Sequence, residues 1–464
     1  MIWIILLLGL IIRLILLDQS LWLDEAINVV NAKNLSLLDF ITKYPIGDFH
    51  PPLYFAILWI WGHVFGFSEI SVRLPSVILA VATLGLTYLI GKDLFSKKIG
   101  LLTALILTLA PLHIYYSQEA RMYSLSCFAA ALSFYFLIRL VQGKSWLGYI
   151  LSLVLLLYSG YLVYLILPSQ LIFVLWSKKS FLKKVVLSQI ISLICLVPWL
   201  SIFNQQLQTG RMAAILLPNW AQVVGGGTVK NIGLLVTKTI TGRISFDNKL
   251  VYGLAIVIPG IVYGFLILRA VIKLTWQIKL LLCWIIIPII LALLISIFIP
   301  VLSYFRMIFI LPAFYLIVAL GLETLPKKYF RLALGFLIIS SLFFLGIFYT
   351  NPRFQRENWK GAVSTLENRA GQETVIMFED NNIPAPYLYY TTGSVKLLPG
   401  LSKVPAASLQ DTVDLKGINK IYQFEYLVDI TDPNRFLQKK IESEFKKIET
   451  LNFNGVGFVY VYER

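Results

Sequence analysis

The chain has 464 residues, of which 58% are hydrophobic and only 14% charged, and its mean hydropathy of +0.78 excludes a soluble globular enzyme, since soluble domains average about 25% charged residues. A net charge of +16 would suggest nucleic-acid binding in a soluble protein. However, residues 1–350 carry 26 Lys and Arg against ten Asp and Glu, and residues 351–464 carry 14 of each, so the excess belongs to the apolar part and no nucleic-acid partner is expected.

Eleven apolar segments are candidates for crossing a bilayer, which takes about 20 residues. They lie at 1–17, 75–91, 99–116, 123–140, 146–159, 161–176, 185–203, 250–269, 279–299, 306–323 and 331–349. The first lacks a basic start and a small-residue cleavage site, so we expect a span and not a signal peptide. The segments 146–159 and 161–176 are short and meet at a weak loop signal, so that one long tilted helix is the alternative to two spans there.

The apolar segment 52–65 has only 14 residues, and its placement decides the topology of everything after it. If it does not cross, five connections fall on one side of the membrane and bring 15 Lys and Arg there against Asp93 and Glu323. Since basic loops stay in the cytoplasm, we predict that 52–65 lies on or dips into the outer face. The N-terminus is then cytoplasmic, and the protein is a multi-pass protein of the plasma membrane.

Hydrophobicity falls abruptly at Tyr349–Pro352. Beyond it, alternating patterns predict strands at 375–380, 420–426 and 457–463 and helices at 361–369 and 432–445. We therefore expect an α-helical polytopic membrane domain at 1–350 and a small soluble α/β domain at 351–464 outside the cell. The outer loops of the membrane domain are 18–74, 117–122 and 204–248.

Acidic residues are scarce on the outer face, and six of the eight lie in the first loop. Asp24 and Glu25 begin a segment of helical apolar spacing. Acids in a first turn complement the helix dipole, and the alternative is a general base at the lipid boundary. Asp48 and His50 precede Pro51-Pro52. This motif is either a turn with an N-capping aspartate or part of a site, but no second histidine lies at a zinc-binding spacing.

The short outer loop 117–122 contains Glu119 and Arg121. The two could form a surface ion pair, which is worth about 0–1 kcal/mol. Alternatively, Arg121 binds a phosphate through its planar fork of donors, and Glu119 holds a cation or an acceptor. Arg306 lies at the outer end of a span, where snorkelling to the interface is the ordinary explanation, and Arg13 is interpreted in the same way.

The order of these motifs resembles a known family. It consists of DE at 24–25, D-x-HPP at 48–52, GFSEISVRLPS at 66–76 and YYSQEARMYSL at 115–125. This order is similar to that in the membrane glycosyltransferases of the protein O-mannosyltransferase group, glycosyltransferase family 39, which have the GT-C fold. The segments LSYFRMIFILPAFYLIVALGL (302–322) and RENWKGAVSTL (356–366) also resemble bacterial members, with RENWKGAVSTL opening an external carboxy-terminal domain.

The resemblance implies an inverting glycosyltransferase that moves a hexose or pentose from a polyprenyl-phosphate donor to a hydroxyl of a glycan, lipid or protein on the outer face. It carries the catalytic role to Asp24, with Glu25 beside it. It carries donor binding to four positions, His50, Glu119, Arg121 and Tyr123. Arg306 is added as a fifth candidate because it lies at the outer end of a span. The cofactor stays unknown, and a divalent cation near Asp24 and Glu119 is an option.

Two other classes of function remain to be separated from a transferase. The first is a secondary transporter or a lipid-linked glycan flippase without transferase activity. Transporter sites lie near the bilayer midplane at the interface of internal repeats, whereas this chain has its acids in an outer loop and shows no clear repeat. The second is a scaffolding membrane protein without a site.

Overall fold

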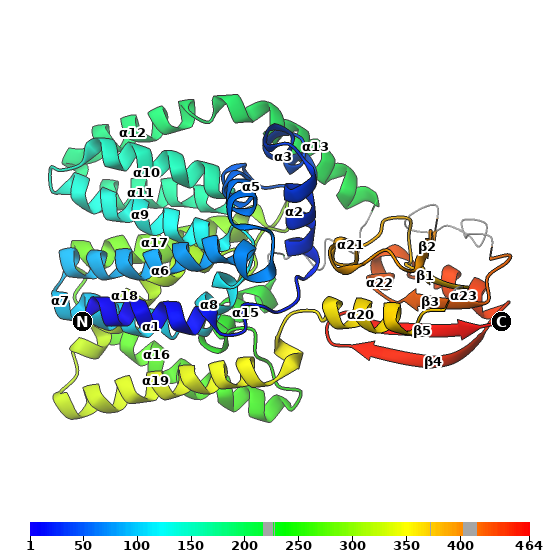
Figure 1. The fold of residues 1–464 in the computed structure, drawn as a ribbon. Coiled ribbons are helices and arrows are strands. Elements are labelled where there is room, and N and C mark those ends of the chain that lie inside the picture. Colours follow the sequence, from blue (N-terminus) through cyan, green and yellow to red (C-terminus); the bar gives the residue numbers. More distant parts are fainter. Residues whose placement is uncertain (217–225, 227, 372, 402–414) are drawn as a thin grey trace. The chain divides into compact units, whose positions relative to one another are not determined.

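The computed structural model describes residues 1–216, 226, 228–371, 373–401 and 415–464 (Figure 1). The chain divides into two units. The membrane unit comprises Met1–Leu17, Ser36–Gln206 and Val224–Thr350. The carboxy-terminal unit comprises Asp18–Leu35, Leu207–Val223 and Asn351–Arg464. A piece of the first loop thus belongs with the carboxy-terminal residues.

The membrane unit is built from helices. They are α1 (Ile2–Leu14), α3 (Leu37–Thr42), α4 (Pro45–Asp48), α5 (Leu53–Phe65), α6 (Glu69–Leu94), α7 (Lys97–Thr108), α8 (Pro111–Ser117), α9 (Tyr123–Val141), α10 (Trp146–Ser159), α11 (Ile166–Ser177), α12 (Leu182–Ile194), α13 (Leu200–Leu216), α15 (Val229–Thr241), α16 (Lys249–Val271), α17 (Trp276–Ile295), α18 (Leu311–Glu323) and α19 (Lys327–Thr350). α13 continues into the carboxy-terminal unit.

Within the described residues, six helical segments are long and apolar enough to cross a membrane, and a seventh is obtained if α7 and α8 count as one span. Five more apolar helices of 10–17 residues, among them Ile2–Leu14 and Leu53–Phe65, are shorter than a simple span. These helices confirm a multi-pass α-helical membrane protein. The count of eleven spans and the placement of α5 on the outer face stay predictions.

The expected continuous span at 99–116 is broken. α7 ends at Thr108, and α8 starts at Pro111 with a change of direction of 65°. Proline has no N–H to donate and disfavours helical backbone in the residue before it, so Pro111 suits the first turn of a new helix and not the interior of an old one. The short helix α8 leads directly into the turn of the second outer loop, which carries Glu119 and Arg121.

The region 146–176 forms two helices. Three hydrogen bonds join α10 to α12 and its C-cap, and the residue numbers of both partners increase in the same direction. They are Trp146 to Ser188, Ser192 to the carbonyl of Ile150, and Tyr158 to the carbonyl of Cys195. α10 therefore runs parallel to α12. Because α11 leads into α12 through a short turn, α11 runs the opposite way to α10, and the chain reverses at Gly160. In Figure 1 these helices lie side by side.

Close packing of small and aromatic residues holds the helices of the membrane unit together. An added Cβ at Gly100 would lie 2.4 Å from the backbone oxygen of Tyr88, so glycine permits α6 and α7 to touch. Deeper in the core, Trp284 stacks on Phe134 with ring centroids 4.0 Å apart and donates to the carbonyl of Phe309. The buried tryptophan thereby satisfies its only donor.

The carboxy-terminal residues form a five-stranded sheet in the order β2-β1-β3-β5-β4. The strands are β1 (Thr374–Met377), β2 (Lys396–Leu398), β3 (Lys420–Phe424), β4 (Lys446–Phe453) and β5 (Gly457–Glu463). β1 pairs in parallel with β2 and β3, whereas β5 is antiparallel to both β3 and β4. β1, β3 and β5 fall where alternation predicts strands.

Helices cover both faces of this sheet. α20 (Trp359–Arg369) and α21 (Ala385–Tyr390) pack on one face through Trp359, Leu366 and Tyr387. α23 (Phe436–Glu442) packs on the other face, and α22 (Val428–Thr431) precedes it. α2 (Leu23–Asn34), from the first loop, contacts α21 and adds Leu23 to the first core.

Candidate functional site

The D-x-HPP motif forms a tight corner between α4 and α5. Asp48 is the last residue of α4, and Phe49 follows in the left-handed conformation with φ = 64°. Pro52 then starts α5 without a side-chain cap. This corner turns the side chain of His50 back onto Asp48, with 2.5 Å between Nδ1 and Oδ1. Asp48 does not cap the following helix, so the interpretation as an N-capping turn is wrong.

Asp48 joins the two motif segments of the membrane unit. Its Oδ2 accepts from Arg121 of the second outer loop at 3.0 Å and from the hydroxyl of Tyr44 at 3.2 Å. The side chains of Arg121 and Asp48 are only 5% and 10% exposed. Arg121 therefore belongs to a buried cluster with Asp48 and His50, and the small energy of a surface pair does not apply to it.

The electrostatics of this cluster favour an ionised Asp48. Burial by itself would raise the pKa of this carboxyl, but the positive charge of Arg121, reinforced by His50 and by hydrogen bonds from both, outweighs burial and holds the pKa well below its usual value. Asp48 is therefore a fixed negative charge at neutral pH, and it orients the guanidinium of Arg121.

Backbone anchors fix the turn that carries Glu119 and Arg121. Gln118 donates through Nε2 to the carbonyls of Arg13 and Ile15, at 3.1 and 2.7 Å, and the hydroxyl of Ser76 donates to the carbonyl of Arg121 at 3.3 Å. Glu119 is fully buried. A turn tied to α1 and α6 in this way presents its charged side chains in one defined arrangement.

An aromatic wall adjoins this turn. Tyr123 packs against Tyr116 and Phe305, with ring centroids 5.0 and 5.8 Å apart. Arg306, the next residue after Phe305, donates to the carbonyls of Pro300 and Val301 at 3.2 and 3.3 Å. Arg306 is therefore engaged with its own loop, next to the wall that contains Tyr123, and simple snorkelling does not describe it.

Arg243 is a further charged residue near this turn that the sequence patterns miss. It follows α15 and donates to the hydroxyl of Tyr115 at 2.9 Å, and it lies within electrostatic range of Glu119 and Tyr116. Lys238 supports its loop by donating to the carbonyls of Arg243 and Ile244. In the sequence, Arg243 is an arginine near the end of loop 204–248 with no motif around it, so nothing there indicated a site residue.

Arg13 does not snorkel. It is fully buried and donates to the carbonyls of Gly9 and Thr108 and to Nδ1 of His113, which lies 2.8 Å from Nη2. Arginine has no acceptor, so His113 accepts through Nδ1 and carries its proton on Nε2. This contact ties α1 to the broken span and makes Arg13 a structural residue.

Asp24 and Glu25 lie in the first turn of α2, as expected, but in the carboxy-terminal unit. Glu25 is fully buried and Asp24 is half-buried. The charge of Asp24 acts on Glu357 and Tyr426 of the same unit. The structure thus brings His50 and Arg121 together through Asp48. Glu119 lies on the same turn as Arg121, and Tyr123 begins the next helix, α9. Asp24 and Glu25 lie in the other unit.

An open hollow of about 660 Å³ lies in the carboxy-terminal unit. Its lining combines a carboxylate, a phenol, two amides and the turn between β4 and β5, contributed by Glu357, Tyr426, Asn452, Asn454 and Gly455 among others. Carboxylates, amides and aromatic rings are groups that can hydrogen-bond and stack on a hydroxyl-rich molecule. The hollow is a candidate place for such a molecule.

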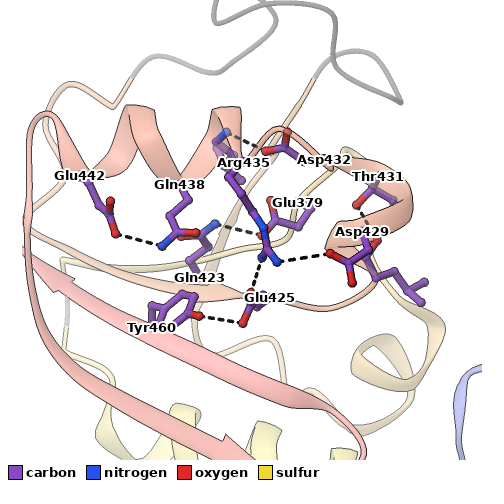
Figure 2. Close-up of polar contacts among 12 residues, drawn as sticks. Glu379, Gln423, Glu425, Asp429, Thr431, Asp432, Arg435, Gln438, Glu442 and Tyr460 are labelled. Carbon is purple, nitrogen blue, oxygen red and sulfur yellow. Dashed lines mark hydrogen bonds and ion pairs between the residues drawn. The ribbon is translucent and has the colours of Figure 1, made fainter. Parts of the chain in front are cut away.

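A second polar cluster in this unit surrounds Arg435 (Figure 2). Arg435 forms ion pairs with Glu425 and Asp429, and Gln423 donates to Glu379 at 3.0 Å. Burial, and then the charge of Asp432, raise the pKa of Glu379 to about 8. Across the residues with described positions, no group of three or more His, Cys, Asp or Glu is placed to hold a metal ion. The two ion pairs of Arg435 link the residue after β3 to α22 and to the start of α23.

Comparisons with known proteins agree with this architecture. The model of the dolichyl-phosphate-mannose-protein mannosyltransferase family matches residues 49–202. This range includes His50 and Arg121 and begins directly after Asp48. No curated protein sequence matches the chain at a significant level.

Solved structures match over almost the whole chain. ArnT from Cupriavidus metallidurans bound to undecaprenyl phosphate matches with a TM-score of 0.61 and 10% identity, over 99% of this chain and 97% of that one. The Archaeoglobus fulgidus oligosaccharyltransferase with Zn and sulfate matches with a TM-score of 0.51 and 12% identity, over 98% and 72%. The chain therefore has the GT-C fold of membrane glycosyltransferases and resembles the protein mannosyltransferase family.

Proposed function

We propose that the protein is an inverting glycosyltransferase that uses a sugar linked to polyprenyl phosphate and passes it to an acceptor hydroxyl at the outer face of the plasma membrane. The observation that carries the proposal is the buried contact between Arg121 and Asp48, together with His50. It joins two motifs 73 residues apart into one anchored cluster, and His50 and Arg121 of this cluster lie within the segment that matches the family. The ArnT structure contains undecaprenyl phosphate, which supports this class of donor.

Arg121 is assigned to the donor phosphate. Asp48 accepts from Nη1 of the guanidinium and orients it, and a planar fork of donors is the arrangement that suits phosphate oxygens. Arg243, braced on Tyr115, adds a second positive charge, and Tyr123 and Arg306 are assigned to the walls around the donor. His50 and Glu119 are assigned to donor binding beside Arg121.

Asp24 is assigned as the general base, with Glu25 buried beside it. In the proposed reaction, Asp24 takes the proton from the acceptor hydroxyl while the oxygen forms a bond to C1 of the sugar. The bond from C1 to the phosphate oxygen breaks, its electron pair stays on the phosphate, and the configuration at C1 inverts. Arginine charges stabilise the leaving phosphate as it gains negative charge. A divalent cation stays a prediction, with Asp24 and Glu119 as its candidate ligands from the sequence.

The test uses the purified full-length protein in lipid nanodiscs and a panel of polyprenyl phosphates that carry labelled hexoses or pentoses. Wild type should release label from at least one lipid, and Asp24→Asn should lower the rate about 10²-fold or more, the range for loss of a general base. Asp18→Asn, an exposed acid of the same loop, should retain activity. The proposal is wrong if wild type releases no label from any donor, or if Asp24→Asn is fully active.

A flippase or transporter is the second candidate function, and it predicts a different fate for the labelled lipid. It would move the labelled lipid between leaflets of a proteoliposome and leave the bond between sugar and phosphate intact. Measuring the leaflet and the covalent state of the label in the same sample separates the two functions.

A further inference from the structure

The helix that carries Asp24 begins without a cap from its own sequence. The N-cap residue of α2 is Trp22, and its side chain makes no capping hydrogen bond. The first backbone N–H groups of any helix need acceptors from elsewhere. In this unit, the carboxylate of Glu357 accepts from the backbone N–H of Leu23. A negative charge at this position also interacts favourably with the positive end of the helix dipole.

The segment just before α2 is attached to the residues around Glu357 and to the last residue of α21. Three hydrogen bonds make the attachment: the N–H of Arg356 to Oε1 of Gln19 at 2.9 Å, the N–H of Lys360 to the hydroxyl of Ser20 at 3.1 Å, and the N–H of Leu21 to the hydroxyl of Tyr390 at 2.8 Å. Leu23 adds its side chain to the core formed with Trp359 and Tyr387. The start of α2 is thus held by both polar and apolar contacts.

Glu357 is itself held rigidly. The indole N–H of Trp359 donates to it at 2.7 Å, and the hydroxyl of Tyr426 donates to its two oxygens at 3.1 and 3.3 Å. Burial raises the pKa of Glu357, and the nearby charge of Asp24 adds to this effect, while the hydrogen bonds oppose it. Glu357 is therefore a fixed group that contacts the helix backbone and also acts electrostatically on Asp24.

We propose that Glu357 is a positioning residue that holds the N-terminus of α2, and so sets the place and the electrostatic surroundings of Asp24. The inference rests on the proposed function of Asp24. It gives the carboxy-terminal domain a direct part in the reaction, because residues 356–360 supply hydrogen bonds to Gln19, Ser20 and Leu23 at the start of the helix.

Two substitutions separate holding from electrostatics. Glu357→Ala removes the acceptor for the N–H of Leu23. Glu357→Gln keeps one acceptor oxygen, which the amide can turn toward the N–H of Leu23, and removes the negative charge. Glu449→Gln is the matched control. Glu449 is an acid of the same domain, about half of its side chain is exposed, and it pairs with Arg369 at the surface.

The first measurement is hydrogen–deuterium exchange of the amides at 22–26 in the full-length protein, which needs no activity. Glu357→Ala should speed exchange at the start of α2 by about 10-fold or more, the effect of losing a hydrogen bond to a charged group. Glu357→Gln and Glu449→Gln should keep the protection of wild type. Unchanged exchange in Glu357→Ala would overturn the proposal.

The second measurement is the release of labelled sugar as a function of pH. Glu357→Ala should lower kcat by about 10²-fold, the typical cost of a misplaced catalytic group, with KM for the donor lipid unchanged. Glu357→Gln should keep most of kcat, but its acidic limb should move to lower pH, because Asp24 ionises more easily without a negative neighbour. A pH profile identical to that of wild type would refute the electrostatic role.

The two readouts keep this proposal distinct from the proposed function. If wild type releases no label from any donor, the transferase function is wrong, and the exchange data still decide whether Glu357 holds α2. If wild type is active and Glu357→Ala is fully active, Glu357 does not position Asp24.

Discussion

Replacement of Asp48 by asparagine should test the buried cluster most directly. Asp48→Asn keeps the size of the side chain and one acceptor oxygen, but it removes the negative charge that pairs with Arg121. At the observed 3.0 Å and an effective dielectric constant of about 20, Coulomb attraction is roughly 5 kcal/mol. Desolvation offsets part of this in the native pair, yet removal of one partner from a buried pair costs about 3–5 kcal/mol. We expect a loss of unfolding free energy in that range.

The pH dependence gives an independent check. The pKa of Asp48 in the folded protein lies below its unfolded value of 3.8, so its contribution to stability is complete above that value and is lost as pH falls below it. The wild-type protein should therefore lose stability below about pH 3.8 more steeply than Asp48→Asn.

The assay is denaturant or thermal unfolding in detergent, followed by tryptophan fluorescence. Asp39→Asn serves as the control, because Asp39 lies in the same loop and pairs with Lys43 at the surface; it should change stability little. Double-mutant cycles of Asp48→Asn with Arg121→Gln should show strong coupling. If Asp48→Asn is as stable as wild type and shows the same acid sensitivity, the buried pair does not contribute as argued.

Two further predictions concern the carboxy-terminal domain and the topology. Glu379→Gln should stabilise the protein, with a gain that grows from about pH 4.5 to 8, because the folded-state pKa of about 8 lies above the unfolded value and ionisation of the buried acid is a penalty; a gain independent of pH in unfolding experiments would contradict this. In a chain without its native cysteines, Lys97→Cys should resist membrane-impermeant thiol reagents in intact cells, whereas Ser364→Cys should react; the reverse labelling would invert the topology. Lys97 is chosen because it is exposed, whereas the neighbouring Ser96 caps α7.

The sequence predicts the parts of the fold that have a strong hydrophobic signal. Apolar length locates the membrane helices, and alternation locates β1, β3 and β5. β4 escapes detection because it is an edge strand with most side chains exposed, so no alternation of buried residues marks it. The bend between α7 and α8 was equally invisible to hydropathy, since Pro111 lies inside a continuous apolar run.

Some residues of the candidate site can likewise be predicted from the sequence, and others cannot. Scarce charges in outer loops draw attention to Asp48, His50 and Arg121, but only the structure shows that Asp48 pairs with Arg121. No local pattern announces a partner 73 residues away. Arg243 has no motif around it, and Arg13 resembles any arginine near a helix end. Charges whose partners are distant in sequence need the fold to be interpreted.

The attachment of the first loop to the carboxy-terminal residues has a consequence for biosynthesis. The residues joined at the start of α2 are separated by 337 to 369 positions in the chain. Since a chain is made from its N-terminus onward, α2 leaves the ribosome long before the RENW stretch exists. The helix of the proposed base can reach its final surroundings only after Tyr390 has been made, and a nascent chain that stops before residue 351 lacks every one of these contacts.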